Sequence, residues 1–279
     1  MKDSPWIPRS SLDVSIVHSF QHLDAAFTTD TGRLRKANED AALIALQHGL
    51  FAVADGMGGG SCGEVASRCI IQALQSYRPS QDSPEQDIQQ VKEAIQRANA
   101  HIYHMAHEKN LSGMGSTLVL ILFHAIQPNR ATLLHAGDSR AYRLRGRKWT
   151  QLMTDHSVAA ENHIPRRKIL PYLRNMITRA VGIAETVTLE QTKLVIEPHD
   201  LFLLCSDGLY NMISPWCLRR FMRQNRDCHV HDLSRQLVEA ANERGGKDNI
   251  TSLLIRVGTP TVDEDEPTAD TVNVSDCAN

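Results

Sequence analysis

Acidic residues stand next to short apolar segments at widely separated places in this chain. Asp55 directly follows the apolar residues 50–54. Asp138 and Asp207 each follow such a segment after one small residue, and Asp248 stands shortly before the last segment. Short apolar runs bounded by turn residues are typical of buried strands. A carboxylate at the end of a buried strand is costly to desolvate, and carboxylates that meet there repel one another. The pattern therefore predicts a compensating positive charge.

Divalent cations would supply that charge. Mg²⁺ and Mn²⁺ prefer oxygen ligands from aspartate, backbone carbonyl groups and water. A glycine after the acid, as in Asp55-Gly56 and Asp207-Gly208, lets the backbone approach an ion. A single Asp-Gly pair is most often a turn. Four acids at strand ends, three of them without a basic residue next to them in the sequence, instead predict a shared metal site.

Apolar runs recur along the chain and predict strands. These runs are residues 43–46, 50–54, 118–126, 131–136, 194–196, 201–205 and 252–257. Two helices are predicted after the second run, over residues 65–77 and 83–105, and the latter opens with Ser83 as N-cap and Pro84 at the first helical position. A later helix pair lies within residues 214–246 and closes at two glycines. This order suits sheets with helices packed outside them.

The composition limits where the protein can act. No apolar run of the 279 residues approaches the roughly 20 residues that a membrane-spanning helix needs. The N-terminus lacks the charged-then-apolar order of a signal peptide. The six cysteines are scattered without a Cys-x-x-Cys pair, which favours reduced thiols over zinc ligands or disulfides. We therefore expect a cytoplasmic protein with no membrane partner.

The charge distribution divides the chain into unequal parts. Residues 260–279 carry six acids and no base, so residues 1–259 have a net charge of +4 although the whole chain is at −2. We expect a disordered acidic tail over 259–279, an N-terminal arm with few periodic cues over 1–24, and one folded domain over 25–258. Because the mild positive charge forms no basic stripe with aromatic residues, no nucleic-acid partner is expected.

Short polar and glycine-containing blocks follow one another through most of the chain. They are Asp30-Thr31-Gly32, Arg35, Asn38-Glu39-Asp40, residues 53–59, Gly115-Ser116-Thr117 and residues 136–140, 154–157, 178–182, 205–209 and 247–251. Each block alone is weakly specific, whereas the ordered set is highly specific. In this order the sequence resembles the metal-dependent protein phosphatases of type 2C, the PPM family, and in particular the compact bacterial serine/threonine phosphatases.

The resemblance implies a fold and a set of ligands. The fold is α+β, a four-layer α-β-β-α sandwich of two antiparallel sheets flanked by helix pairs. The cofactors are Mn²⁺ or Mg²⁺, as two core ions and a weaker third. The resemblance assigns Asp55, Asp207 and Asp248 to the first ion, and Asp55 with the carbonyl of Gly56 to the second. It assigns Asp138 with Asp207 to the third ion. Glu39, Asp40 and Asn249 would form the surrounding shell, in which Glu39 and Asp40 would reach metal-bound waters.

The resemblance also implies an activity, the hydrolysis of phosphoserine and phosphothreonine in proteins. A water bridging the two core ions would attack phosphorus, and the same charges would stabilise the transition state. Asp55 and Asp207 would act through the metals, and the planar guanidinium of Arg35 would hold the substrate phosphate. The implied partners are phosphorylated proteins, among them a cognate bacterial serine/threonine kinase and its targets, and a monomer is expected.

The sequence departs from the family pattern at a few places. Met57 stands where animal members have a histidine proposed to protonate the leaving group, and Gly60 stands where bacterial members commonly carry one. The segment 158–177 resembles the family's flap but is short and carries the basic residues 166–168. These departures predict a modest rate, with the leaving-group proton supplied by water.

Two other interpretations have to be weighed. Gly58, Gly60 and Gly63 fit the G-x-G-x-x-G pattern of dinucleotide binding, but the following acid, Asp82, lies between two predicted helices instead of at the end of a strand. The other alternative is a pseudophosphatase, a catalytically weak scaffold that keeps the fold and acts by binding. Metal-dependent hydrolysis of p-nitrophenyl phosphate would distinguish an enzyme from such a scaffold.

Overall fold

A computed structural model describes residues 20, 22–58, 62–80, 83–111, 113–162 and 176–259. Most of the expected N-terminal arm, Gly60, the middle of the flap-like segment and the acidic tail from residue 260 lie outside these residues. Within the described ranges, no helix combines the length and the apolar character needed to cross a membrane.

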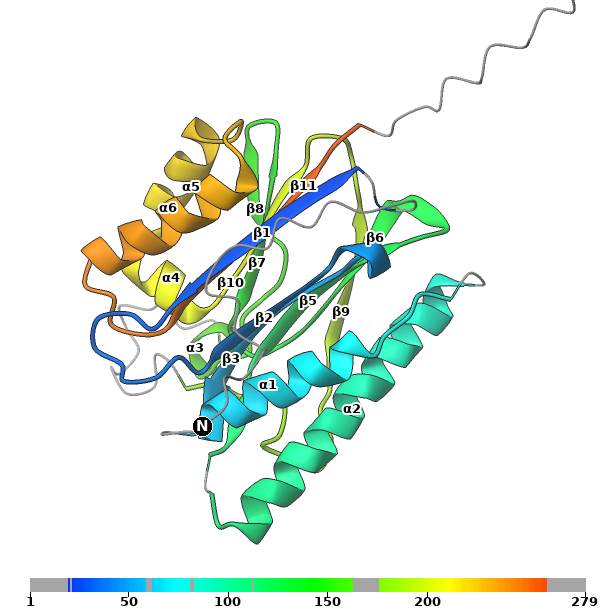
Figure 1. The fold of residues 1–279 in the computed structure, drawn as a ribbon, viewed down its shortest axis with the longest axis vertical. Coiled ribbons are helices and arrows are strands. Elements are labelled where there is room, and N and C mark those ends of the chain that lie inside the picture. The colour runs from blue at the N-terminus through cyan, green and yellow to red at the C-terminus, as the bar shows by residue number, and fades with distance from the viewer. Residues whose placement is uncertain are drawn as a thin grey trace, which may run out of the picture.

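Two antiparallel sheets lie at the centre of the protein (Figure 1). The first sheet has the strand order β1 (Leu23–Asp30), β11 (Ile250–Val257), β10 (Leu201–Cys205), β7 (Arg140–Arg145) and β8 (Lys148–Gln151). The second has the order β2 (Asp40–Ala45), β3 (Leu50–Met57), β5 (Leu118–His124), β6 (Gln127–Ala136) and β9 (Glu190–Val195), with β4 (Gly115–Ser116) paired to β3.

Helices cover the outer face of each sheet (Figure 1). The helices on the second sheet are α1 (Cys62–Gln75) and α2 (Pro84–Glu108), and those on the first sheet are α4 (Asp207–Met212), α5 (Pro215–Gln224) and α6 (Val230–Glu243). Short helical turns, η1 (Leu46–His48) and α3 (Val158–Glu161), lie in connecting segments. This order confirms the four-layer α-β-β-α sandwich.

The core explains why the central strands are apolar without interruption. On β3, Ala52 belongs to the cluster under α1 and α2, whereas Phe51 and Val53 belong to the cluster between the two sheets. Side chains alternate across a strand, so a strand buried on both faces needs apolar residues at every position. The rings of Phe51 and Phe202, one from each sheet, pack edge-on against Phe123 with centroid distances of 5.7 and 6.0 Å.

The helix boundaries follow the predicted capping residues. The side chain of Ser83 accepts a hydrogen bond of 3.1 Å from Gln86 N at the start of α2, and Ser214 accepts one of 3.3 Å from Cys217 N at the start of α5. Helix α6 ends at Glu243, just before the two glycines at 245 and 246, which both have positive φ. The local signals for these three helices are confirmed.

Several elements differ from the sequence-based expectation. Strand β1 begins at Leu23, inside the segment expected to be the N-terminal arm, and Phe20 is buried against the core between the sheets. The arm therefore cannot extend to residue 24 as expected. Strands β7 and β8 were not predicted, and the strand expected over 118–126 ends at His124. Charged residues at Arg140, Arg143 and Arg145 interrupt the apolar pattern of β7.

Candidate active site

Both sheets contribute acids to one end of the sandwich. Asp55 lies two residues before the end of β3, and Asp138 comes two residues after the end of β6, a strand of the same sheet. Asp207 begins α4 directly after β10, and Asp248 precedes β11, both in the other sheet. The charge of Asp55 interacts with those of Asp138, Asp207, Asp248 and the neighbouring Asp40. The structure thus brings together all four acids that the sequence singles out.

Asp40 occupies a polar pocket beside Asp55. The two residues face each other in the ladder between β2 and β3. Asp40 Oδ2 accepts hydrogen bonds from Ser206 Oγ at 2.7 Å and from Thr251 Oγ1 at 2.6 Å. Its other oxygen, Oδ1, is buried and has no hydrogen-bond partner among the described residues. A buried carboxylate oxygen of this kind needs either a hydrogen-bond donor, such as a water molecule, or a cation to which it can bind.

The acids disfavour one another's ionised forms. Burial, followed by repulsion from Asp138, raises the pKa of Asp207 to about 8. Burial raises the pKa of Asp40 to about 6 and that of Asp138 to about 6, and burial together with the neighbouring acids holds the pKa of Asp55 well above its usual range. A set of carboxylate oxygens under this repulsion fits hard divalent cations, since positive charge would relieve both effects.

Two glycines are needed for the close packing of these segments. A Cβ atom on Gly56 would lie 2.1 Å from the carbonyl oxygen of Gly63, at the start of α1. A Cβ atom on Gly208 would lie 2.0 Å from the carbonyl oxygen of Asn249. Any side chain at either position would push apart the segments that carry Asp55, Asp207 and Asn249. The glycine after each aspartate is therefore a packing requirement as well as a turn.

Asn249 holds the loop that carries Glu39. Its Oδ1 accepts a hydrogen bond of 2.9 Å from Glu39 N, and its Nδ2 donates to the carbonyl oxygens of Thr31 and Ala37, both at 2.9 Å. The side chain of Glu39 is buried, which raises its pKa. Asn249 thus braces the backbone of residues 31–39 against the start of β11, a role that the sequence did not indicate.

Arg35 lies at the edge of the acid cluster. Its Nη2 donates a hydrogen bond of 2.7 Å to Asp248 Oδ2, and about half of its side chain is exposed, at 49%. Its positive charge also acts on Asp207, where it opposes the rise in pKa. An arginine that is tied to the cluster on one side and open to solvent on the other is placed to contact an incoming anion.

A second network surrounds Asp138. The hydroxyl of Tyr210 donates to Asp138, 3.0 Å from its carbonyl oxygen and 3.2 Å from Oδ2. The guanidinium of Arg140 lies over the Tyr210 ring, 3.6 Å from its centroid, and binds Asp155 through Nε and Nη2. Arg140 and Asp155 stand in sequence blocks noted above but had no assigned role. Tyr210 carried no sequence signal, because an aromatic residue three positions after Asp207 is also an ordinary core residue.

His156 fixes the turn that precedes Asp138. The N–H of Gly137 donates to His156 Nδ1 at 3.2 Å, and the N–H of His156 donates to Gly137 O at 2.9 Å. Since Nδ1 accepts, the neutral ring carries its proton on Nε2, which donates to Glu190 Oε2 at 3.1 Å. The backbone next to Asp138 is therefore held from two sides by one residue.

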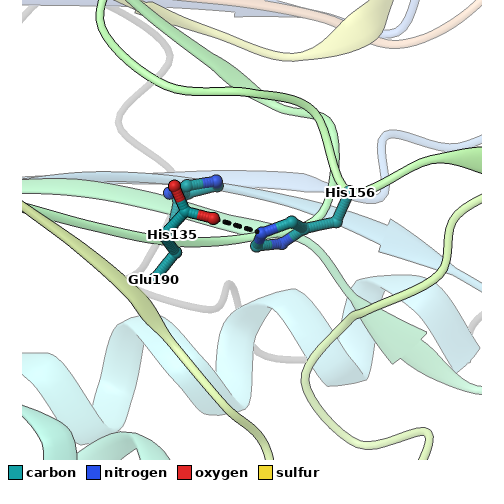
Figure 2. A group of neighbouring side chains, drawn as sticks. All are labelled: His135, His156 and Glu190. Atoms are coloured by element: carbon teal, nitrogen blue, oxygen red, sulfur yellow. Dashed lines mark hydrogen bonds and ion pairs between the residues drawn. The ribbon is translucent and has the colours of Figure 1, made fainter. Parts of the chain in front are cut away.

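The proton on His156 Nε2 also bears on whether the group of His135, His156 and Glu190 can bind a metal ion. Their potential ligand atoms lie within 4.8 Å of one another, and the two rings stack at 4.4 Å (Figure 2). A metal at His156 Nε2 would require its proton to move to Nδ1, which would then face the N–H of Gly137. His135 Nε2 in turn donates to the carbonyl oxygen of Thr154 at 3.0 Å. The group is a hydrogen-bonded brace for the Asp138 turn.

The histidines of α2 lie apart from these acids. His101, His104 and His107 are exposed on the surface of this helix.

Comparison with known proteins gives consistent matches over most of the chain. A family model described as Protein phosphatase 2C matches residues 34–254. The serine/threonine phosphatase stp of Listeria monocytogenes is 31% identical over 245 residues, which cover 84% of this chain and 95% of that protein. The serine/threonine protein phosphatase PstP of Mycobacterium tuberculosis is 33% identical over 243 residues, covering 83% of this chain and 44% of that protein.

Solved structures show the same arrangement of elements. A structure described as PppA, a key regulatory component of T6SS in Pseudomonas aeruginosa, matches with a TM-score of 0.77 and 36% identity over 85% of this chain and 98% of that one. The catalytic domain of PstP in complex with two manganese ions matches with a TM-score of 0.73 and 33% identity over 85% of this chain and 99% of that one.

Proposed function

Because the chain belongs to the protein phosphatase 2C family, we propose that it removes phosphate from serine and threonine residues of proteins with the help of divalent cations. The observation that carries this proposal is the group of acids around Asp55, drawn from both sheets and under mutual repulsion. Such a group has no structural use without positive charge, and it suits a phosphate-hydrolysing metal centre.

The proposed ligands divide between core and periphery. Asp55, Asp207 and Asp248 would hold the first core ion, and Asp55 with the carbonyl of Gly56 would hold the second. Asp138 with Asp207 would hold a third, more weakly, while Glu39 and Asp40 would face the waters around the ions. When bound, Mn²⁺ or Mg²⁺ would supply a water of lowered pKa and positive charge for the developing transition state. The related structure with two manganese ions supports the choice of metal.

The nucleophile would be water, because the thiol and the hydroxyl nearest the acids are not free to act as one. The thiol of Cys205 is fully buried, and burial raises its pKa to about 12, so it remains protonated. The hydroxyl of Ser206 donates to Asp40 and accepts from Thr251 N at 2.9 Å. Both groups near the acids are thus engaged in packing or hydrogen bonds. Arg35 at the edge of the cluster would hold the phosphate oxygens of the substrate and orient them.

The partners follow from the activity. We infer that phosphorylated proteins are the substrates and that a bacterial serine/threonine kinase and its targets are among them. The similarity to a regulatory component of the T6SS in Pseudomonas aeruginosa makes such a regulatory pathway a specific candidate. Quantitative phosphoproteomics of a lysate should reveal phosphoserine and phosphothreonine sites that wild-type protein removes and an Asp207→Asn variant leaves in place.

The activity itself is tested with two substrates. Protein stripped with EDTA should not hydrolyse p-nitrophenyl phosphate or a phosphothreonine peptide, and Mn²⁺ should restore both reactions. Hydrolysis that is unaffected by EDTA would contradict the metal-dependent mechanism. If Mn²⁺ binds but neither substrate is turned over, the protein is a binding scaffold of the same fold and the proposed enzyme activity is wrong.

A further inference from the structure

A strongly basic groove lies on the surface between α5 and the turn that joins β7 to β8. Its volume is about 500 Å³, and it is lined by Arg147, Trp216, Arg219, Arg220, Arg223 and Arg226 together with two uncharged residues. Trp216 is 65% exposed, and the guanidinium of Arg220 lies 5.6 Å from the centroid of its ring. We call this the arginine groove.

The positive charge of the arginine groove is almost uncompensated. Of the arginines that line it, only Arg226 forms an ion pair with an acid of the described chain, the exposed Asp227. Arg219 and Arg223 stand four residues apart on α5, where like charges destabilise a helix. A groove of this kind attracts an anionic ligand, because the ligand would relieve repulsion that the protein does not relieve itself.

The groove lies at the opposite end of the first sheet from the acids of the active site. Strand β10 runs from Leu201 to Cys205, which is next to the site, and Leu201 lies beside Leu144 and Arg256 on the neighbouring strands. A smaller hollow of about 180 Å³ is lined by these three residues and by His199 and Asp227, and it shares Gly146 and Arg226 with the groove. The two hollows are therefore adjacent, and together their lining residues extend from Arg256, near the end of β11, to α5.

The described chain ends at the beginning of this path. Arg256, near the end of β11, donates through Nη2 to the carbonyl oxygens of Arg226 and Cys228, both at 2.6 Å. Thr259 follows three residues later as the last described residue. In Figure 1, the red end of β11 and the turn between β7 and β8 lie at the same end of the molecule. The next residues, 260–279, carry six acids and no base.

We propose that the arginine groove binds the chain's own acidic segment 260–279, with residues 263–266 (Asp-Glu-Asp-Glu) as the main contacts. The segment is too poor in apolar residues to form a core, but an extended acidic strand can bind through charge alone. The exposed Trp216 beside the arginines adds an apolar contact for the prolines and valines of the segment. The active site is not involved.

The segment is long enough to reach. From Arg256 to Leu144 the path crosses two strand spacings, about 10 Å. The 20 residues after Thr259 span up to about 66 Å when extended, which is several times the width of the path. A tether this short keeps the segment at an effective concentration on the order of millimolar, so even weak contacts suffice to keep the groove occupied.

A labelled peptide tests the proposal on the full-length chain. The probe is a fluorescein-labelled peptide of residues 260–279, followed by fluorescence anisotropy in about 50 mM NaCl, where exposed charges are only partly screened. One protein is wild type. A second has a neutralised segment, with Asp263→Asn, Glu264→Gln, Asp265→Asn and Glu266→Gln. A third adds Arg219→Gln and Arg223→Gln to the second. A fourth adds Arg235→Gln on α6 and Arg244→Gln directly after α6 instead, as a control with the same loss of charge outside the groove.

The second and fourth proteins should bind the peptide saturably, and about 500 mM NaCl should abolish this binding. Wild type should bind at least about tenfold more weakly, because its own segment competes. The third protein should bind no better than wild type. Mn²⁺-dependent hydrolysis of p-nitrophenyl phosphate, which should be equal in all four, verifies their folding.

Equal binding to wild type and to the second protein would overturn the proposal and leave the groove open to a separate acidic partner. Equal losses in the third and fourth proteins, or no binding to any of them, would also overturn it.

Discussion

Asp40 and Asp55 face each other across neighbouring strands, so that two carboxylates share one rung of the second sheet. Like charges at directly opposed positions weaken a sheet. The chain accepts this arrangement at the end of the sandwich where Asp207 and Asp248 add further negative charge. The sheet is therefore locally less stable at the place where the proposed cations would stabilise it.

Replacing Asp207 by Asn should abolish phosphatase activity. Asp207 is the proposed ligand of two ions, and an amide cannot supply its charge. Loss of a metal should remove several kcal/mol of transition-state stabilisation, which corresponds to a loss of at least about 100-fold in kcat/KM. The measurement is turnover of a phosphopeptide at saturating Mn²⁺. A variant that keeps more than about a tenth of the wild-type rate would contradict the ligand assignment.

The same substitution should stabilise the metal-free protein at alkaline pH. The pKa of Asp207 is raised to about 8 in the fold, so its favourable contribution is complete below the unfolded pKa of about 4 and is lost as the pH rises through 8. In EDTA, wild type and Asp207→Asn should melt alike only at about pH 4 and below, and the advantage of the variant should grow with pH until it melts about 4 °C higher or more at pH 9. Comparing the two proteins cancels the contribution of titrating groups that do not interact with Asp207. Equal melting temperatures at pH 9 would mean that Asp207 is not destabilising when ionised.

Replacing Asp138 by Ala should have a milder effect. Asp138 is assigned only to the third ion, which would keep most of its water shell and therefore bind weakly. The fold and tight metal binding should remain, while turnover falls less than in Asp207→Asn. Isothermal titration with Mn²⁺ on both variants, beside phosphopeptide turnover, tests this order. Loss of the tightest site in Asp138→Ala would place Asp138 in the core pair, and unchanged turnover would deny the third ion a catalytic role.

Replacing Asn249 by Ala should destabilise the protein even without metal. The change leaves Glu39 N and the carbonyl oxygens of Thr31 and Ala37 without their side-chain partner. Buried groups left unpaired cost about 1–3 kcal/mol each, partly recovered by water, so we expect a loss of about 2–4 kcal/mol in the free energy of unfolding. Urea denaturation in EDTA measures it. Asn225→Ala, which removes one bond to Phe221 O at the end of α5, is the control and should cost under about 1 kcal/mol. Equal losses would contradict the bracing role.

Two substitutions of His156 separate its two contacts. In His156→Asn the amide oxygen can replace Nδ1 as acceptor for Gly137 N–H, whereas in His156→Gln the amide nitrogen can replace Nε2 as donor to Glu190. If the bond to Gly137 positions Asp138, the Asn variant should stay within about threefold of wild-type turnover and the Gln variant should fall about tenfold. The Gln variant should also need more Mn²⁺ for half-maximal rate. The reverse order would show that the contact with Glu190 is the important one.

The sequence predicted the strands correctly where an uninterrupted apolar run is enough to identify them. Strand β10 and the middle of β3 are buried on both faces, so their apolar runs predict them correctly. Strand β7 was not predicted because it contains arginines whose ion-pair partners are distant in the sequence. Arg145, for example, binds Asp200 through Nε at 2.7 Å, a partner 55 positions away. Nothing local to residues 140–145 indicates that such a partner exists.

The residues of the candidate site also fall into those that the sequence pattern predicts and those that it does not. The positions of Asp55, Asp138, Asp207 and Asp248 at strand ends follow from the sequence pattern, and the structure places them together. Their supporting residues do not follow from it, because they depend on the register between strands and on contacts across the two sheets. Asp40 is a case in point, since its donor Thr251 lies 211 positions away.

The position of β11 has a consequence for biosynthesis. This strand lies between β1 and β10 in the first sheet, and Asp248 and Asn249 immediately precede it. On the ribosome, β1 is therefore made long before the strand to which it bonds, and the acids of β2 and β3 emerge before Asp248 and the asparagine that braces their loop. Domains complete their folding only when their last essential element is available. A nascent chain of this protein cannot bring Asp248 and Asn249 into the proposed catalytic centre before its synthesis has passed residue 257, so the proposed activity on phosphoproteins begins only after that point.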